Sequence, residues 1–320
     1  MPKGLLPETD EGDIVRTFVP ASDEKMLKMI VGQGIMEGLA RANNKTILHP
    51  AVFAITLILG SAFDYYFNLY PSSNPLSYIS PLIGPCIALL PIMGVIEYLN
   101  RPAFTALLRR TIGAIDMVKP DVYYRQGRSG IWVFQHKREL IGAVCLDGTD
   151  NAGQKLETVL GEEEGQLSTA RMVYTLISEE MDLKQLPPQL GKHTATEKKS
   201  TPLPKKIAQI RHLDVYQPWR RSGVGSELLL AALDYAFGIG SLQSAAPTVE
   251  AVIVHFSPFS PGGSKIFKKC GFNYMTQEEI DQTWSTNEKI GTLGWQGRWM
   301  KINKEAWLIK RKEMLTKRPF

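Results

Sequence analysis

The sequence predicts a mixed α/β domain that is interrupted by a two-helix membrane hairpin. Three observations lead to this prediction. Residues 207–276 alternate between β-rich and helical runs. Residues 46–96 carry a single formal charge, and a basic glycine turn joins a strand to a helix at residues 215–229. A chain of 320 residues has room for one substantial domain with additions.

The chain opens with a predicted strand and helix. Residues 14–19 have the alternation of a strand, and Ser22 with Asp23 can cap a helix that continues to about Leu39. No basic segment followed by an apolar one occurs near the N-terminus, so we expect no cleaved secretory signal. We assign residues 14–45 to the first strand and helix of the domain.

Two apolar blocks follow, residues 47–66 and residues 76–98. Each approaches the roughly 20 residues that a membrane-spanning helix needs. The turn-forming residues 71–75 are too few for anything but a hairpin between the blocks. We therefore expect a transmembrane helical hairpin over residues 46–99, with both outer ends on the same side of the membrane.

The residues around the hairpin bear on its orientation. Arg41 and Lys45 precede it and Arg101 follows it, and positive flanks favour the cytosolic side. Asp64 is expected to meet water at the turn end, beside a cluster of aromatic residues that suits a membrane interface. Two other interpretations stay open, namely a buried helical hairpin in a soluble protein and a re-entrant wedge.

The domain continues over residues 100–146. Residues 101–117 carry apolar side chains at helical spacing with basic residues between them, which suits a helix lying along the membrane surface. Residues 131–134 and 140–146 are β-rich runs separated by a polar turn, so they predict a hairpin of two strands.

The remainder divides into three parts. Residues 147–206 are low in apolar side chains, which is typical of a mobile insertion, with a helical patch around residues 168–181. Residues 207–303 predict alternating elements: strand 207–215, helix 223–237, strand 249–256, helix 262–269 and strand 272–276. Residues 304–320 form a basic C-terminal tail that either lies on anionic lipid or is solvated.

Composition argues against several classes of function. The cysteines Cys86, Cys145 and Cys270 form no CxxC pair and have no histidine at ligand spacing, so we expect reduced thiols and no metal site. The formal charge of +5 is small for this length, and basic residues do not alternate with exposed aromatics along any segment. We therefore expect no nucleic-acid partner.

The strongest chemical signal is the turn between the strand that ends at Val215 and the helix that begins near Gly223. Gly223 and Gly225 allow close approach of a ligand, and the first N–H groups of a helix have no partner within it. The helix start carries about half a positive charge, to which Arg220 and Arg221 add. A pyrophosphate fits this turn without a metal, whereas the fingerprints of dinucleotide-binding and Walker loops are incomplete.

The pattern Arg220-x-x-Gly223-x-Gly225 resembles the coenzyme A signature of GNAT acetyltransferases, and residues 267–272 resemble the helix-to-strand element that follows it. A hairpin inserted after the first helix is similar to the arrangement of the camello-type membrane-anchored acetyltransferases, which include cysteine-S-conjugate and aspartate N-acetyltransferases of the endoplasmic reticulum. The resemblance implies a mostly antiparallel central sheet flanked by helices. It also implies acetyl-CoA as acetyl donor and an integral protein of the endoplasmic reticulum membrane, in contact with lipid, with its N-terminus and domain in the cytosol.

Cofactor-binding residues follow from the same resemblance. Backbone groups near Val215 and Gln217 would bind the pantetheine arm of the coenzyme. The pyrophosphate would be held by the consecutive residues Arg220, Arg221, Ser222, Gly223, Val224, Gly225 and Ser226. The sheet would splay beside them to admit the thioester.

Acetyl transfer to an amine requires a route by which the amine loses a proton. The family's acid tyrosine and its asparagine correspond to Phe267 and Ser260, and a glutamate base found in some members corresponds to Gln209. Phe267 cannot donate a proton and Gln209 cannot titrate. The remaining catalytic candidates are His212 and His255, of which His212 is the preferred proton acceptor, and a purely structural role is the alternative for both.

Two functions stay open. The first is an N-acetyltransferase acting on a small amine, an amino-acid conjugate or a lysine side chain. The second is a non-catalytic membrane chaperone or adaptor for another membrane protein, such as a transporter, which the missing tyrosine and asparagine favour. The intact glycine turn favours the first, because a scaffold without a cofactor has no physical need for an anion-binding helix start.

Overall fold

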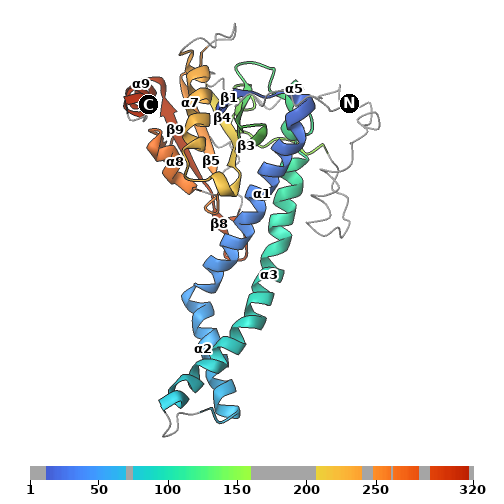
Figure 1. The fold of residues 1–320 in the computed structure, drawn as a ribbon, viewed down its shortest axis with the longest axis vertical. Coiled ribbons are helices and arrows are strands. Elements are labelled where there is room, and N and C mark those ends of the chain that lie inside the picture. The colour runs from blue at the N-terminus through green and yellow to red at the C-terminus, as the bar shows by residue number, and fades with distance from the viewer. Residues whose placement is uncertain are drawn as a thin grey trace, which may run out of the picture.

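The structure is a computed structural model of the chain, and it describes residues 12–69, 75–159, 207–239, 248–260, 262–280 and 289–316. Figure 1 shows a globular domain with a long helical hairpin projecting from one end. The helical patch expected at residues 168–181 lies outside the described residues.

Seven strands form the central sheet, in the order β1-β2-β3-β4-β5-β9-β6. Their bounds are β1 Ile14–Thr17, β2 Gly130–His136, β3 Glu139–Asp147, β4 Ile207–Val215, β5 Ala251–Phe256, β6 Asn273–Tyr274 and β9 Arg298–Asn303. In the part of the chain that the structure describes, β4 and β5 are the one parallel pair of this sheet. The predicted mixed, mostly antiparallel sheet is therefore confirmed. A separate ribbon pairs β7 Lys289–Ile290 with β8 Trp295–Gln296.

Helices cover both faces of the sheet because its strands bury side chains on both. Val144 and Leu146 of β3 belong to one apolar core, and the alternating Ala143 and Cys145 belong to the other. The first core packs against α7 Val224–Phe237, α8 Gly263–Lys269 and α9 Lys304–Thr316. The second packs against α1 Pro20–Ile47, α3 Ile83–Ile112, α4 Ile115–Val118 and α5 Pro120–Tyr123.

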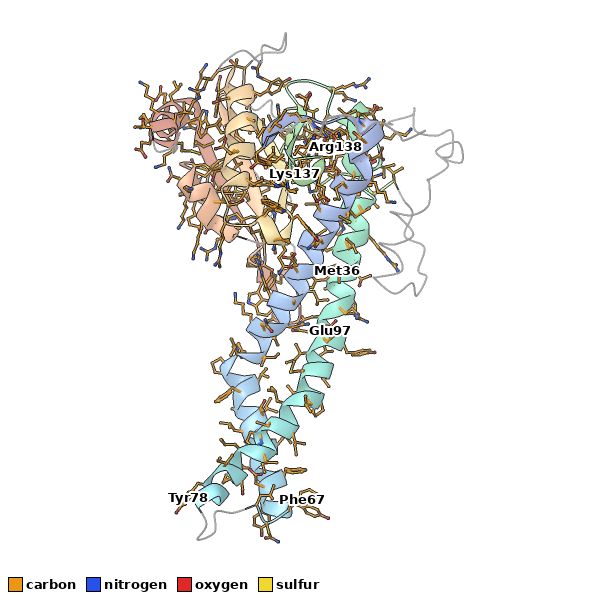
Figure 2. The ribbon with its side chains drawn as sticks, in the orientation of Figure 1. Met36, Phe67, Tyr78, Glu97, Lys137 and Arg138 are labelled. Atoms are coloured by element: carbon orange, nitrogen blue, oxygen red, sulfur yellow. The ribbon has the colours of Figure 1, made fainter. Side chains whose placement is uncertain are left out.

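The projecting hairpin consists of the end of α1, then α2 Pro50–Tyr66, the 3₁₀ segment Pro75–Leu82 and the first half of α3. Figure 2 places Phe67 and Tyr78 at its far tip, Glu97 on the part of the hairpin nearer the domain, and Lys137 with Arg138 in the globular domain. Large apolar side chains are exposed along it, among them Phe53, Ile58, Leu82, Leu90 and Val95. By length and composition the stretch Tyr78–Ile112 can cross a membrane, and α1 with α2, bent by 63°, passes the same test as a pair.

Several helix boundaries differ from the sequence-based predictions. Helix α1 begins at Pro20, whose fixed φ suits a first helical position, so Ser22 and Asp23 lie inside the helix. Asp23 still accepts a hydrogen bond from the N–H of Val19, at 2.8 Å. Helix α3 runs unbroken through Pro102 to Ile112, so the separate surface helix expected over residues 101–117 is wrong.

The expectation for Asp64 is also wrong. Its side chain is buried between α2 and α3 and accepts a hydrogen bond from the N–H of Gly84, at 2.9 Å. The first N–H groups of a helix have no hydrogen-bond acceptor within the helix. The carboxylate of Asp64 is the acceptor for one of these groups at the start of α3. Gly60 and Gly84 allow this approach, since a Cβ on Gly84 would lie 2.2 Å from the carbonyl oxygen of Gly60. Asp64 therefore joins the two helices of the hairpin.

Residues 304–316 of the basic tail form a helix that packs on the domain. Trp307 of α9 is fully buried in the core beside α7, and its indole N–H donates to Asp234, at 3.0 Å. Arg311 donates to the same carboxylate, at 2.8 Å. In Figure 1, α9 lies on the globular part, away from the projecting hairpin. These contacts explain the order of α9 without a lipid surface.

Candidate functional site

The site begins where β4 and β5 separate. The two strands pair in parallel from Ile207 with Ala251 to Ile210 with Val254, and beyond that β4 continues to Val215 without pairing to β5. A bulge against β3 accompanies the separation and leaves Arg211 as an extra residue on β4. A cavity of about 1160 Å³ lies in the gap and is lined by β4, the end of β5, the glycine turn, α1, α3 and α8.

The glycine turn borders this cavity and begins α7. Gly223 caps the helix with φ of 101°, a left-handed conformation that favours glycine. No described residue accepts a hydrogen bond from the N–H groups of Val224 and Gly225, and the N–H of Ser226 bonds back to the Gly223 carbonyl at 2.8 Å. A Cβ on Gly225 would lie 2.5 Å from Ile266 of α8, so glycine fits closely there. The turn thus offers two unpaired donors at a helix start, which suits an anion.

Arg220 is more constrained than the sequence indicates. Its Nε donates to the carbonyl of Val215 at 2.8 Å, and its two terminal nitrogens donate to the carboxylate of Glu37 on α1. Both side chains of this ion pair are mostly buried. Arg220 therefore connects α1 to the turn. Only the N–H groups of Arg220 that do not make these contacts are available to a ligand.

The other expected cofactor residues have mixed roles. Ser222 donates its hydroxyl to the carbonyl of Trp219 at 2.6 Å, which closes the turn. Arg221 is exposed, with φ of 70°. Gln217 begins a short 3₁₀ turn and, like Val215, lines the cavity. Seven of the nine expected residues line the cavity, whereas the side chains of Ser222 and Val224 do not. Arg220 and Ser222 also make contacts within the protein.

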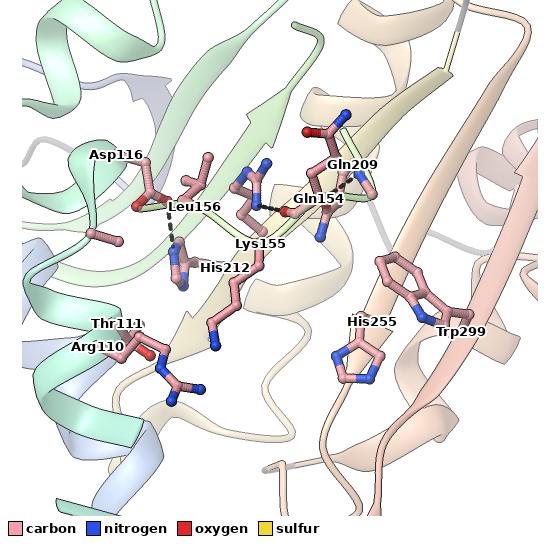
Figure 3. A pocket seen from close by; sticks show the side chains of 13 residues that line it. Arg110, Thr111, Asp116, Gln154, Lys155, Leu156, Gln209, His212, His255 and Trp299 are labelled. Atoms are coloured by element: carbon pink, nitrogen blue, oxygen red, sulfur yellow. Dashed lines mark hydrogen bonds and ion pairs between the residues drawn. The ribbon is translucent and has the colours of Figure 1, made fainter. Parts of the chain in front are cut away.

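His212 belongs to a buried hydrogen-bonded group that includes a residue missed from the sequence. Its Nε2 lies 3.0 Å from Asp116 of α4, and the same carboxylate oxygen accepts from the hydroxyl of Tyr124 at 3.0 Å. Figure 3 shows the contact between His212 and Asp116 at the wall of a pocket. A carboxylate can only accept, so the proton lies on Nε2 and Nδ1 is left as the basic nitrogen.

Asp116 is suited to hold an imidazolium. Its side chain is 2% exposed. Burial opposes its charge, but the hydrogen bond from His212 and the charges of His212 and Arg211 hold the pKa of Asp116 below its ordinary value. A carboxylate that stays ionised beside a histidine stabilises the protonated ring. Asp116 lies on a four-residue helix, which explains why no sequence pattern pointed to it.

The remaining catalytic candidates fall into different surroundings. His255 of β5 packs its ring against Trp299, with centroids 4.9 Å apart. The side chain of Gln209 is buried and accepts from the N–H of Gly153 at 2.7 Å, so it has a structural role. Phe267 is buried in the core with Phe256 and Phe272.

A second, smaller pocket of about 210 Å³ lies beyond His212. It shares four lining residues with the larger cavity, namely Thr111, Arg211, His212 and His255. The two spaces therefore adjoin at these side chains. A ligand in the large cavity and another in the small pocket would meet beside His212.

Asp214 is a further titratable group that the sequence did not single out. It follows His212 by two residues on β4, so both side chains face the α1 side of the sheet. Burial raises the pKa of Asp214 to about 6, against the opposing charges of His212 and Arg220. Gly34 of α1 allows its placement, since a Cβ there would lie 2.3 Å from an oxygen of the Asp214 carboxyl group.

Two parted strands, a helix start with unpaired donors and a large cavity form a cleft that suits an anionic ligand. No protein-family model and no curated protein matches the sequence. Solved structures that are similar to this chain include several acetyltransferases.

Three of these structures illustrate the likeness. A GNAT-family acetyltransferase from Staphylococcus aureus is 9% identical, with 59% of this chain and 76% of that chain covered and a TM-score of 0.33. The Vibrio cholerae spermidine N-acetyltransferase, in complex with CoA and spermine, is 13% identical, with 61% and 76% covered and a TM-score of 0.32. The Escherichia coli ribosomal-protein-S18-alanine N-acetyltransferase is 11% identical, with 63% and 86% covered and a TM-score of 0.30. Such distant likeness does not decide the activity, which has to be inferred from the site.

Replacing Asp214 tests the electrostatics of this cleft. Because its pKa is raised in the folded state, the folded protein binds this proton more tightly than the unfolded chain does. Its contribution to stability is therefore fully present below about pH 4 and is lost as the pH rises through about 6. We expect Asp214→Asn to be more stable than the wild type at pH 7, with a smaller difference at pH 4.5, in urea denaturation of detergent-solubilised protein. An equal difference at both pH values would contradict the assignment.

Proposed function

We propose that this protein is a membrane-anchored N-acetyltransferase of the GNAT type, which transfers acetyl from acetyl-CoA to an amine. One observation carries the proposal. The cavity between the parted strands β4 and β5 connects the unpaired N–H groups at the start of α7 with His212. An anion-binding end and a basic nitrogen are thereby placed in one cleft.

The residues present fit the donor. The N–H groups of Val224 and Gly225 would bind the pyrophosphate, aided by the helix dipole and by Arg221. The stretch of β4 up to Val215 that does not pair with β5 would lie along the pantetheine arm. The cavity of about 1160 Å³ exceeds the usual range of ligand pockets, roughly 300–1,000 Å³, so it has room for a large donor.

His212 would take the proton from the acceptor ammonium group through Nδ1, with Asp116 stabilising the imidazolium. The neutral amine then forms a C–N bond with the acetyl carbonyl carbon, and the C–S bond of the thioester breaks. The thiol of the coenzyme is a tolerable leaving group, because an ordinary thiol has a pKa of about 8.5. After the C–N bond forms, the nitrogen loses a second proton, which passes to the thiolate, and the proton held by His212 is released to solvent. No tyrosine at position 267 is therefore required.

For the acceptor, the class proposed is an amine. The spermine bound by the Vibrio cholerae enzyme is one such compound. The small pocket beyond His212, of about 210 Å³, would receive the polar end of the acceptor. Amino-acid conjugates and lysine side chains belong to the same chemical class.

We also propose that the hairpin is embedded in a membrane, with the domain in the cytosol, most simply at the endoplasmic reticulum. The support is physical. Exposed Phe53, Ile58, Leu82, Leu90 and Val95 would face water on a free hairpin, whereas lipid would cover them. Helix α2 has 17 residues, or about 25 Å, close to the roughly 30 Å of a bilayer core.

Binding of acetyl-CoA is the first prediction. Calorimetric titration of detergent-purified protein should give micromolar affinity, and an Arg220→Ala, Gly223→Pro double variant should lose at least tenfold, because the turn no longer forms and no longer connects to Glu37. Arg138→Ala, an exposed charge in the β2–β3 turn, is the control and should bind like the wild type. If acetyl-CoA does not bind at millimolar concentration, the proposal of an acetyltransferase is wrong, and the alternative of a non-catalytic adaptor is favoured.

The pair His212 and Asp116 gives a prediction about rate. We expect His212→Gln to lower kcat by about 10²-fold or more while acetyl-CoA still binds. Asp116→Asn should lower kcat while acetyl-CoA still binds, because the imidazolium loses its counter-charge. Tyr124→Phe removes the other hydrogen bond to Asp116 but keeps its charge, and it should have a kcat close to that of the wild type. A wild-type kcat in Asp116→Asn would exclude this role.

Membrane insertion can be tested by fractionation. The full chain should stay in the membrane pellet after alkaline carbonate extraction, because the hairpin buries its apolar surface in lipid. A variant with Phe53, Ile58, Leu90 and Val95 each changed to Glu should be released or fail to insert. Release of the wild-type chain into the supernatant would contradict the proposal.

A further inference from the structure

The ribbon β7–β8 lies at the junction between the globular domain and the projecting hairpin (Figure 1). Its tip is the turn at residues 291–294. In this turn the backbone N–H and the hydroxyl of Thr292 donate to the side-chain oxygen of Asn100 on α3, at 2.9 and 3.1 Å. The amide nitrogen of Asn100 donates in turn to Asn43 of α1, at 2.9 Å. The turn is therefore held against α3 and linked to α1 at one level of the hairpin.

The surface of the hairpin changes at this level. Lys45 of α1 and Arg101 of α3 lie close to it and are exposed. Glu97, one turn beyond Asn100, pairs with Arg101 at 3.3 Å. Farther toward the tip, the part of the hairpin that the structure describes has one more charged side chain, Asp64, and it is buried. Such a change suits a boundary between membrane and water, because charged side chains are costly in hydrocarbon and cations gather on its cytosolic side.

Apolar side chains of two separate elements are exposed at this boundary. Leu293, which follows Thr292 at the tip of the ribbon, is 44% exposed. Tyr98 and Leu99, which precede Asn100 on α3, are exposed as well. Tyrosine is a residue typical of membrane interfaces, and a leucine is stabilised by leaving water. The exposed apolar surface is therefore not confined to the two helices of the hairpin.

We propose that the tip of the β7–β8 ribbon is a third contact with the bilayer, in which Leu293 enters the interfacial layer beside α3. The proposal rests on the membrane insertion proposed above. The observation that carries it is the pair of hydrogen bonds from Thr292 to Asn100, which holds an exposed leucine where the charges of the hairpin end.

A phospholipid interface is the partner that this surface fits. A bilayer around the hairpin would already cover Tyr98 and Leu99, and Leu293 is held at the same level. Two helices and a ribbon then contact the membrane, so the domain cannot tilt freely about the hairpin. The direction in which the cleft opens relative to the bilayer is thereby fixed.

The test is quenching of a fluorescent label by lipids that carry a nitroxide. Cys86→Ala removes the exposed cysteine, and Cys145 and Cys270 are buried. In this background Leu293→Cys is labelled with bimane, and the full chain is placed in phosphatidylcholine nanodiscs with the nitroxide near the headgroup. We expect the fluorescence to fall by about half or more, because interfacial side chains lie roughly 5–10 Å into the boundary between headgroups and acyl chains.

Two matched variants show where the lipid reaches. Leu308→Cys lies on α9, away from the hairpin in Figure 1, and with 39% exposure it should keep its fluorescence. Leu90→Cys lies ten positions from Asn100 on α3, which is about 15 Å along the axis and half of a roughly 30 Å bilayer core. It should be quenched more strongly by a nitroxide near the chain end, whereas Leu293→Cys should be quenched more strongly by one near the headgroup.

The pattern of quenching keeps the two levels distinct. If Leu90→Cys is quenched and Leu293→Cys is not, the ribbon contact is wrong while the hairpin is still in the membrane. Quenching of Leu308→Cys as strong as that of Leu293→Cys would also overturn the ribbon contact, because lipid would then reach the domain without selection. If Leu90→Cys is not quenched, the membrane insertion itself is wrong.

Discussion

The separation of β4 from β5 is the constraint on which the site depends. Parallel strands that stayed paired to their ends would fill the cleft with backbone hydrogen bonds and leave no room for a ligand. Pairing instead ends at Ile210 and Val254, and the bulge at Arg211 redirects β4 just beyond that point. The side chain of Arg211 stabilises the bulge by donating to Asp147 at 2.6 Å and to the carbonyls of Gln154 and Asn151. The bulged strand then carries His212 and Asp214 into the cavity.

The hairpin and the cleft are mechanically one unit because α1 belongs to both. It packs against the sheet near its start, borders the cleft over its middle turns and continues to the hairpin. The ribbon β7–β8 reinforces the junction, since Trp295 packs on Phe259 with centroids 4.9 Å apart and Asn100 of α3 accepts from the N–H of Thr292 at 2.9 Å. A domain held this way keeps a fixed orientation to whatever surrounds the hairpin.

Much of the fold followed from local patterns. The β-rich runs on either side of residues 136–139 and the glycine turn before α7 are local signals, so both elements were predicted within a few residues. Strand β9 was missed although Trp299, Met300 and Ile302 are buried on it, because its neighbours in space lie far away in sequence. Helix α1 was cut short because its glycines lower helix propensity, which packing against α3 outweighs.

Site residues could be predicted from the sequence only where they are consecutive in the chain. The turn from Arg220 to Ser226 is such a run, whereas Asp116, Glu37 and Asp214 have no neighbours in sequence that point to their roles. Each becomes informative only through a partner about 100 or more positions away. The expectation that Asp64 meets water failed for the same reason, since its partner Gly84 lies across the hairpin.

The close approach of Gly34 to Asp214 restricts which residues can occupy the two positions at the same time. Any side chain at position 34 would bring a Cβ to 2.3 Å from the carboxyl group, closer than atoms can approach. A larger residue there is compatible with the fold only when position 214 carries a shorter side chain or turns it into the cavity. Variation at the two positions should therefore be correlated among related sequences. A glycine at position 34 together with an aspartate at position 214 would indicate that a related protein keeps this acidic group in its cleft.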